Sequence, residues 1–276
     1  NLYKKLKLLT SRSQKKNNLK FNHNLDGKGT DRVIEYLYRL TNKKVKKSDF
    51  DIVEQLNKTR KRNKLAISIC TDKESWINKY IPKLIYEISN YSEKINWSHT
   101  YSKLPKSDIC FILGYNSIIS NQKLRRNKLN LVVHESNLPS GRGWSPLSWQ
   151  VLNGTNTITS SIIKANNKVD SGEIYIKKDI ILNGNELVED LRIKQFNTTS
   201  LLCSLFLKNY PHILKKGKKQ LGIASYYPRR TNRDSKININ NSIKENFNLL
   251  RIVDNEKYPA WFKLKGQKYI LKIFKS

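Results

Sequence analysis

The sequence lacks several features that mark particular classes of protein. It has no Met, three Cys in 276 residues, and no apolar run near the roughly 18 residues that a membrane-spanning helix needs. Cys70, Cys110 and Cys203 lie far apart and outside any Cys-x-x-Cys or His-x-x-His spacing. This excludes a disulfide framework and a strong zinc signature, so we predict no metal site. The N-terminus also lacks a secretory signal, and we expect a protein of the reducing cytoplasm.

Acidic residues are scarce as well. The chain has 22 Asp and Glu against 53 Lys and Arg, a formal net charge of +31. Such a charge attracts polyanions, which leaves nucleic acid, anionic lipid and phosphorylated substrates open as partners. Lys, Asn and Ile are all abundant, however, and an AT-rich genome would produce the same bias. With 38% hydrophobic residues the chain can still bury a core in one or two domains.

Residues 1–63 are polar and basic, with two short helical patterns. One follows Asp31 and the other follows Ser48, each with apolar residues at helical spacing. We expect a basic helical extension over 1–63, whose role the sequence does not indicate. The chain starts at Asn1 and has no Met, as a fragment of a longer protein would.

From Lys64 onward, continuous apolar runs alternate with helical patterns. Continuous apolar runs predict buried strands at 65–70, 108–113 and 129–134. A helical pattern from Trp76 to Ile88 lies between the first two, although Pro82 should kink or break it. Alternating buried strands and helices indicate an α/β protein with a mostly parallel sheet and helices on both faces. Ligands bind such sheets beyond the carboxyl ends of the strands.

The third strand ends at His134 and leads into a loop shaped by Pro and Gly. Ser145 and Pro146 predict the start of a helix that runs to about Asn153. Strands are then expected at 157–165 and 173–182, joined by a tight turn that contains Asp170. His134 and Asp170 should therefore lie in neighbouring loops. Each alone is weak evidence, since such a His is usually structural and such an Asp usually forms a turn.

These segments together resemble the tetrahydrofolate-dependent formyltransferases, which include methionyl-tRNA formyltransferase and the sugar-nucleotide N-formyltransferases. The family's His-x-Ser-x-Leu-Pro, Arg-Gly and later Asp-x-Gly correspond to His134–Pro139, Arg142–Gly143 and Asp170–Gly172. The resemblance runs from about Lys64 to Leu182 and implies the Rossmann-like formyltransferase fold. We expect a catalytic domain over 64–185, a helix and Arg-rich segment over 186–235, and a small α+β tail over 236–276.

The resemblance implies transfer of a formyl group from N10-formyltetrahydrofolate to a primary amine. His134 would act as acid or base, and Asp170 would orient it, relay protons or favour its charged form. The family's Asn two residues before the His is Val132 here. Asn130 would sit roughly 13 Å back along the strand, at about 3.3 Å per residue, and is too far. Asn116 and Asn137 are candidate substitutes.

The same resemblance implies the binding residues. Those expected at the folate are Ile118, Leu138, Arg142, Gly143 and Asn166. Those expected at the acceptor are Trp144, Arg229 and Arg230, because Tyr227–Ser235 resembles an Arg-Arg segment that meets the nucleotide in sugar-nucleotide formyltransferases. Arginine forks suit diphosphate oxygens, although a helix-capping contact or a surface salt bridge is the ordinary alternative.

These motifs do not decide which molecule accepts the formyl group. The charge favours tRNA, because phosphate contacts give affinity without sequence reading. The Arg-Arg segment favours a nucleotide-linked amino sugar, and the residues after it leave no room for a tRNA-binding barrel of roughly 100 residues. We expect the amino sugar, with methionyl-tRNA formyltransferase as the alternative and an inactive anion-binding homologue as a second. A homodimer with no membrane span is also expected.

Overall fold

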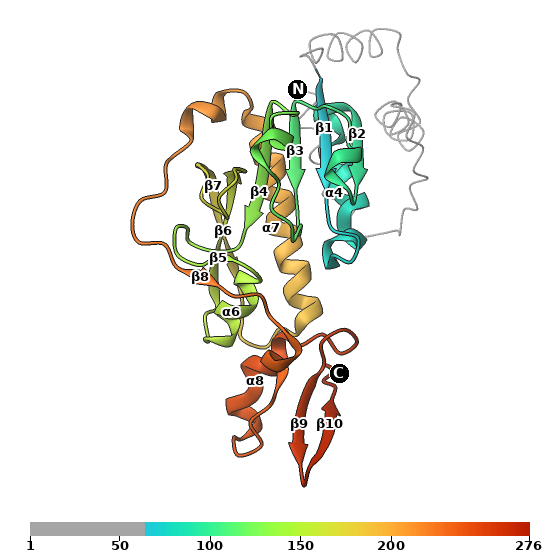
Figure 1. The fold of residues 1–276 in the computed structure, drawn as a ribbon, viewed down its shortest axis with the longest axis vertical. Helices are drawn as coiled ribbons and strands as arrows, with labels where there is room; N and C mark the ends of the chain where they lie inside the picture. Colours follow the sequence, from blue (N-terminus) through green and yellow to red (C-terminus); the bar gives the residue numbers. More distant parts are fainter. Residues whose placement is uncertain (1–63) are drawn as a thin grey trace, which may run out of the picture. The chain divides into compact units, whose positions relative to one another are not determined.

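The computed structural model describes residues 64–276 (Figure 1). The helical extension expected over 1–63 lies outside the described residues. Within them, no helix is long and apolar enough to cross a membrane.

The fold is built on a six-stranded sheet with the order β2-β1-β3-β4-β6-β7. The first four strands in that order run parallel, β6 is antiparallel to β4, and β7 is antiparallel to β6. The predicted α/β class with a mostly parallel sheet is confirmed. The sheet strands are β1 Leu65–Cys70, β2 Ser92–Ser98, β3 Ile109–Ile112, β4 Leu129–His134, β6 Thr157–Lys164 and β7 Ile174–Ile181.

The remaining elements connect or cover the sheet. The α-helices are α4 Ile81–Ile88, α5 Asn121–Leu124, α6 Pro146–Leu152, α7 Val188–Asn209 and α8 Ile243–Ile252. The 3-10 helices are η1 Trp76–Tyr80, η2 Ser89–Tyr91, η3 Tyr101–Lys103, η4 His212–Lys216 and η5 Asn232–Ser235. Two small sheets pair β5 Arg142–Gly143 with β8 Tyr226–Tyr227 and β9 Ala260–Leu264 with β10 Gln267–Leu271.

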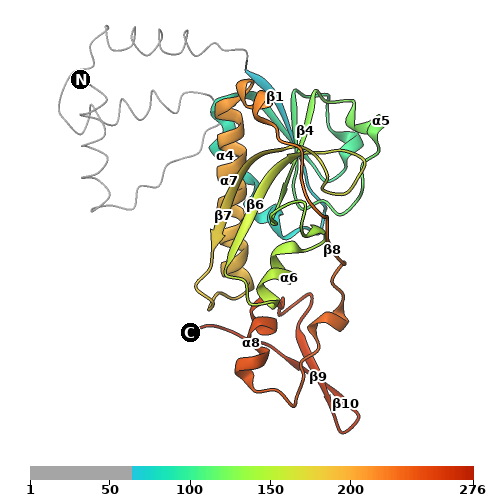
Figure 2. The same cartoon turned by 90° about the vertical axis from the view of Figure 1, so that its left-hand side faces the viewer.

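Helices lie on both faces of the central sheet, as predicted (Figure 2). On one face α4 and α7 close the main core, where Phe196 and Phe206 pack in the same cluster as Leu131 of β4. On the other face η3 and α5 close a smaller core that contains Tyr101 and Leu124. Because side chains alternate along a strand, the two faces of β4 serve these two cores. The three cysteines are free and buried within them.

Two local predictions need correction in detail. Pro82 does not kink one long helix, because η1 ends at Tyr80 and Pro82 stands in the first turn of α4, where its missing N–H is not needed. Ser145 does occupy the N-cap of α6, but its backbone is left-handed, with φ of 49°, and its side chain makes no capping hydrogen bond. Strand β2 was not predicted from the sequence.

The C-terminal part joins the sheet through α8. Ile252 packs in one apolar cluster with Leu147 of α6 and Leu191 of α7. Beside it Arg251, 1% exposed, reaches the Glu186 carboxylate at 3.1 Å. A hairpin of β9 and β10 follows, and positive φ angles at Lys265 and Gly266 form the two-residue turn that hairpins favour. The C-terminal segment is thus anchored by both apolar packing and a buried ion pair.

Candidate active site

His134 and Asp170 meet at the carboxyl end of β4, as the sequence predicts. His134 is 5% exposed, and its Nε2 donates to the Gly141 carbonyl oxygen at 2.8 Å. Its Nδ1 lies 3.4 Å from Oδ2 of Asp170. Both ring nitrogens therefore face oxygen atoms, which fixes the orientation of the ring.

The Asp170 carboxylate is held in place from a strained turn. Asp170 has a left-handed backbone with φ of 45°, and its Oδ2 accepts a hydrogen bond from the Gly143 N–H at 2.9 Å. Its backbone oxygen accepts from Gln220 Nε2 at 2.7 Å. At Gly172 a Cβ atom would lie 1.7 Å from the Lys164 carbonyl oxygen, so only glycine fits. The Asp-x-Gly spacing therefore has a steric reason.

The loop after His134 is joined to the Arg-rich segment. Strand β5 pairs with β8, and the Trp144 N–H donates to the Tyr227 oxygen at 3.1 Å. The backbones approach so closely that a Cβ on Gly143 would lie 2.4 Å from that same oxygen. Further on, Trp149 Nε1 donates to the Pro228 oxygen at 2.9 Å. This pairing carries the next two residues, Arg229 and Arg230, to the site of His134.

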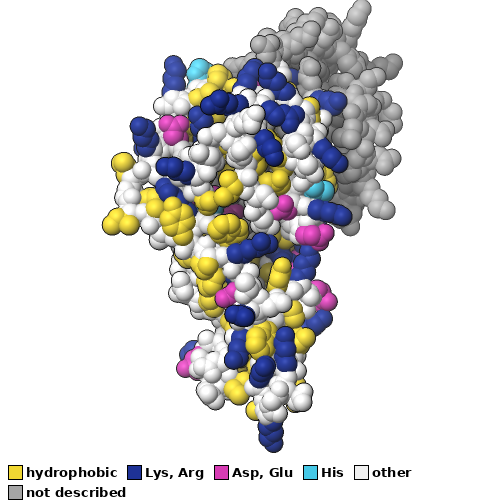
Figure 3. Space-filling view, viewed as in Figure 1, with side chains coloured by type: hydrophobic (Ala, Val, Ile, Leu, Met, Phe, Trp, Pro, Cys, Tyr) yellow, Lys and Arg dark blue, Asp and Glu magenta, His cyan; other side chains and the backbone are white. Residues whose placement is uncertain are grey.

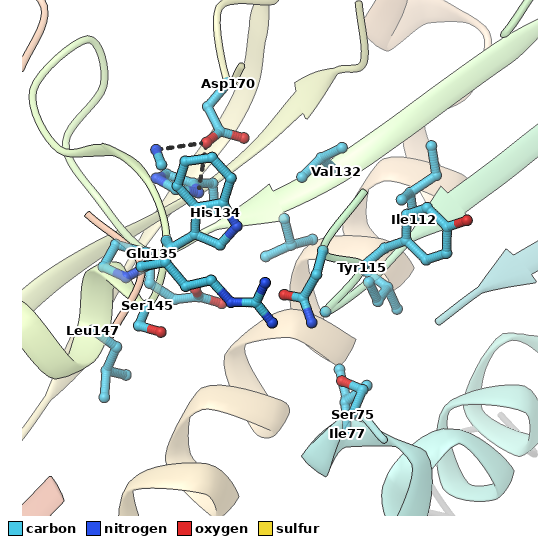
Figure 4. Close-up of a pocket in the computed structure, with 18 of the residues that line it drawn as sticks. Ser75, Ile77, Ile112, Tyr115, Val132, His134, Glu135, Ser145, Leu147 and Asp170 are labelled. Atoms are coloured by element: carbon cyan, nitrogen blue, oxygen red, sulfur yellow. Dashed lines mark hydrogen bonds and ion pairs between the residues drawn. The ribbon is translucent and has the colours of Figure 1, made fainter. Parts of the chain in front are cut away.

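A cavity of about 580 Å³ opens beside His134 and Asp170 (Figure 4). Figure 4 shows Val132 and Ile112 beyond this pair, with Ser75 and Ile77 on another side of the space. The predicted binding residues that line the cavity are Ile118, Gly143, Trp144, Asn166, Arg229 and Arg230. One cavity thus holds both expected catalytic residues and most of the expected binding residues.

Leu138 and Arg142 are the two predicted folate contacts that do not line this cavity. The Leu138 side chain is 3% exposed. The Arg142 guanidinium is turned away, with Nη2 donating to Gln220 Oε1 at 2.6 Å and the group lying over the Tyr226 ring. Since Gln220 also binds the Asp170 backbone, Arg142 stabilises the turn that carries Asp170.

Three asparagines were considered as replacements for the amide missing at Val132, and their positions differ. Asn130 is buried against the opposite core, where its Oδ1 accepts from the Tyr101 hydroxyl at 2.6 Å. Asn137 does not line the cavity, and its Oδ1 accepts from Lys177 Nζ at 2.7 Å. Asn116 does line the cavity. It is the one of the three whose position suits a substrate contact.

Arg230 is an unusually placed cation. Its guanidinium lies over the Trp149 ring at 5.9 Å, and Nη2 donates to the Asp234 backbone oxygen at 3.1 Å. Its Nε is buried with no hydrogen-bond partner among the described atoms, and burial lowers the pKa of the group. No carboxylate in the part of the chain that the structure describes forms an ion pair with Arg229 or Arg230. A salt bridge to a described carboxylate therefore does not hold them, whereas the contact of Arg230 with the Asp234 carbonyl of η5 is of the helix-capping kind.

Two further residues belong to this site and were not identified from the sequence. Gln220 connects Arg142 with the backbone of Asp170 and Gly172. Its partners are distant in the sequence, so no local signal marks it. Glu135 lines the cavity directly after His134 and is 8% exposed. A carboxylate at the end of an apolar strand was the available signal for it.

Residues 64–276 contain no cluster of three or more potential metal ligands.

Comparison with known sequences is consistent with this geometry. The family model described as Formyl transferase matches residues 47–201, more than half of the chain. The chain is 30% identical over 194 residues to the bifunctional polymyxin resistance protein ArnA of Wigglesworthia glossinidia brevipalpis. That match covers 67% of this chain and 29% of ArnA. The chain also spans about half the length of several methionyl-tRNA formyltransferases that it matches.

Solved structures show the same fold. A methionyl-tRNA formyltransferase from Clostridium thermocellum superposes with a TM-score of 0.60 at 23% identity, covering 76% of this chain and 92% of that one. A sugar N-formyltransferase from Shewanella gives a TM-score of 0.54 at 13% identity, covering 75% and 96%. The sequence motifs, the meeting of His134 with Asp170 and the family match agree, and the chain belongs to the formyl transferase family.

Proposed function

We propose that this protein transfers a formyl group from N10-formyltetrahydrofolate to the primary amine of a nucleotide-linked amino sugar. The observation that carries the proposal is that one cavity is lined by the His134–Asp170 pair and by two arginines without carboxylate partners among the described residues. The His134–Asp170 pair suits acyl transfer to an amine, and Arg229 and Arg230 suit an acceptor that carries phosphate.

The cavity has the character that a folate needs. Its volume of about 580 Å³ lies within the range of roughly 300–1,000 Å³ that is usual for sites of small molecules. Ile118 is 63% exposed at this cavity, an apolar surface that a flat aromatic ligand can cover. On another wall Asn166 and the backbone leading to Asp170 offer polar groups. We expect Ile118 and Asn166 to contact the folate, with the formyl group directed toward His134.

His134 is placed to move the protons of this reaction. With Gly141 accepting from Nε2 and Asp170 beside Nδ1, the charged ring is held in one orientation. When protonated, the ring can give a proton to the folate nitrogen as the carbon–nitrogen bond breaks, and the neutral ring that remains can then take one from the former amine. Asp170 stabilises the charged ring and is itself fixed by the Gly143 N–H.

The developing oxyanion needs a hydrogen-bond donor, because Val132 offers none. The Asn116 side chain is our candidate, since it lines the cavity and its backbone N–H is fixed to Asp72 Oδ2 at 2.6 Å. One good donor at such a position is worth about 10²–10³ in rate.

The acceptor would be held by Arg229 and Arg230. Because Arg230 lines the cavity and forms no ion pair with a described carboxylate, a diphosphate oxygen would compensate its charge. Trp144 also lines the cavity, and its ring is our candidate surface for a base or a sugar.

Methionyl-tRNA is the second candidate acceptor, favoured by the net charge of +31 and by the curated relatives. Figure 3 shows lysines and arginines scattered over the molecular face rather than gathered around one groove. Such a distribution supports general attraction of polyanions more than a defined path for tRNA.

The test is a transfer assay on the purified protein. N10-formyltetrahydrofolate is incubated with UDP-linked and dTDP-linked amino sugars and, separately, with methionyl-tRNA, while release of tetrahydrofolate is followed by absorbance. The proposal expects turnover with a nucleotide-linked amino sugar and little with methionyl-tRNA. Turnover with methionyl-tRNA alone would establish the second candidate, and no turnover with any amine would contradict both.

A further inference from the structure

Glu135 is a buried carboxylic acid on the wall of the cavity. It follows His134 at the end of β4, and Figure 4 shows both residues bordering the same space. Gln150 Nε2 donates to its backbone oxygen at 2.6 Å, which fixes the main chain at this point. Gln195 of α7 lines the same cavity. Glu135 is therefore held in position at the cavity and does not fluctuate on a free loop.

No Lys or Arg of the described residues forms an ion pair with Glu135. Of its ionisable neighbours, His134 stabilises the charge of the carboxylate when protonated, and Asp170 opposes it. The cation on the neighbouring turn of α7, Arg192, is already paired with Glu189 and Asp254. A buried carboxylate without a cation is costly, and an apolar residue would stabilise the fold better. This arrangement becomes favourable when a cation enters the cavity.

The acceptor supplies such a cation. A primary amine reaches the cavity as an ammonium ion and must lose a proton before its nitrogen can attack. Burial raises the pKa of Glu135, with smaller opposing effects from His134 and Gln195, and so makes its carboxylate a stronger base. His134 is charged when it serves as acid, so it cannot take this first proton.

On the basis of the proposed function, we propose that Glu135 is a catalytic residue that accepts the first proton from the acceptor ammonium. The free amine then forms a bond to the formyl carbon, and the carbonyl electron pair moves to oxygen. When the bond to N10 breaks, its electron pair stays on that nitrogen, which takes a proton from His134. His134 regains a proton from the former amine, and Glu135 releases its own to water. Each turnover thus releases one proton.

The central variant is Glu135→Gln, which keeps the size and hydrogen bonding of the side chain and removes its basicity. A carboxyl whose pKa is raised in the folded state loses stability as pH rises through that pKa, so the amide should leave the folded protein at least as stable at pH 8. Asp179→Asn is the matched control, because it also removes one carboxylate but lies on β7, where Asp179 binds Thr159. Melting temperatures of both variants establish that they are folded.

The assay measures kcat/KM for a UDP-linked or dTDP-linked amino sugar from pH 6 to pH 9. We expect Glu135→Gln to lose on the order of 10²–10⁴-fold at pH 7, with the KM for folate unchanged. The loss should shrink as pH rises, because more of the acceptor then arrives deprotonated, while Asp179→Asn should follow the wild-type profile. A wild-type rate in Glu135→Gln, or a loss that is equal at every pH, would overturn this inference alone. No turnover by the wild type would overturn it together with the proposed function.

Discussion

The two halves of the cavity are built on opposite principles. Around His134 the polar atoms already have partners, since both ring nitrogens face oxygens and Asp170 also accepts from the Gly143 N–H. Around Arg230 the partners are incomplete: Nη2 donates to the Asp234 backbone oxygen, but Nε is buried without a partner among the described atoms, and no described carboxylate forms an ion pair with the group. The first half is complete before anything binds. In the proposed function, a ligand completes the second.

This difference teaches where each contribution to catalysis arises. In the proposed function, the pre-oriented His–Asp pair would spend no binding energy on its own arrangement and would lower the barrier of the chemical step directly. The arginines would contribute when an anionic acceptor binds, and would therefore act on affinity for that acceptor. Substitutions in the two halves should therefore separate into effects on kcat and effects on KM.

The largest effect is expected at His134. His134→Asn should abolish formyl transfer, because in the proposed function His134 supplies the proton that the folate nitrogen takes as it leaves. The fold should persist, since His134 lies at the end of β4 rather than within the apolar clusters. The checks are turnover and the melting temperature. Near-full activity in the folded variant would remove the chemical half of the account.

A smaller effect is expected at Asp170. Asp170→Asn keeps an oxygen that can accept from Gly143 but removes the negative charge beside the ring. We predict a loss on the order of 10²–10⁴ in kcat, with little change in the KM for the acceptor. A rise in KM at unchanged kcat would show that Asp170 binds substrate instead.

Substitution of the arginines should change KM rather than kcat. Arg230→Ala and Arg229→Ala should each raise the KM for a nucleotide-linked acceptor, since each lost charge-assisted contact is worth about 1.5–3 kcal/mol. The KM for folate should not change. Arg233→Ala is a matched control, because Arg233 lies in the same segment but does not line the cavity. Equal effects of all three variants would indicate general attraction rather than a site.

The smallest effect concerns salt. If Arg229 and Arg230 bind one diphosphate, few counterions are released, and the acceptor KM should rise only modestly between 50 mM and 200 mM salt. A tRNA acceptor, by contrast, would lose about 10³–10⁵ in affinity over this range if it makes 6–10 phosphate contacts. Steady-state kinetics at the two salt concentrations distinguish these cases. A steep dependence would move the preference to methionyl-tRNA.

Much of the sheet could be predicted because its signals are local. The apolar runs of β1, β3 and β4 mark strands buried on both faces, and Pro146 marks the start of α6. Strand β2 was missed because an edge strand with the sequence SEKINWS has no such run. Its place depends on pairing with β1, which the local pattern does not contain.

The residues of the site also divide into those with a local sequence signal and those placed by long-range contacts. His134 and Asp170 could be predicted from motifs that strand ends and a tight turn explain. The direction of the Arg142 side chain could not be predicted, because it depends on a hydrogen bond with Gln220, which is 78 positions away in the sequence. The choice of Asn116 over Asn137 as the candidate hydrogen-bond donor could not be predicted either. It follows from the position of Asn116 at the cavity and from the contact of Asn137 with Lys177. Long-range contacts decide which motif residues face the cavity.

The most direct test of the central claim is a comparison of two acceptors in one variant. In the Arg229→Ala/Arg230→Ala double variant, formyl transfer is measured with a nucleotide-linked amino sugar and with the same amino sugar lacking the nucleotide. The account predicts that the variant loses most of its kcat/KM for the first acceptor and keeps the wild-type value, however low, for the second. Equal losses with both acceptors would contradict it, because the arginines would then serve the chemistry or the fold rather than the nucleotide.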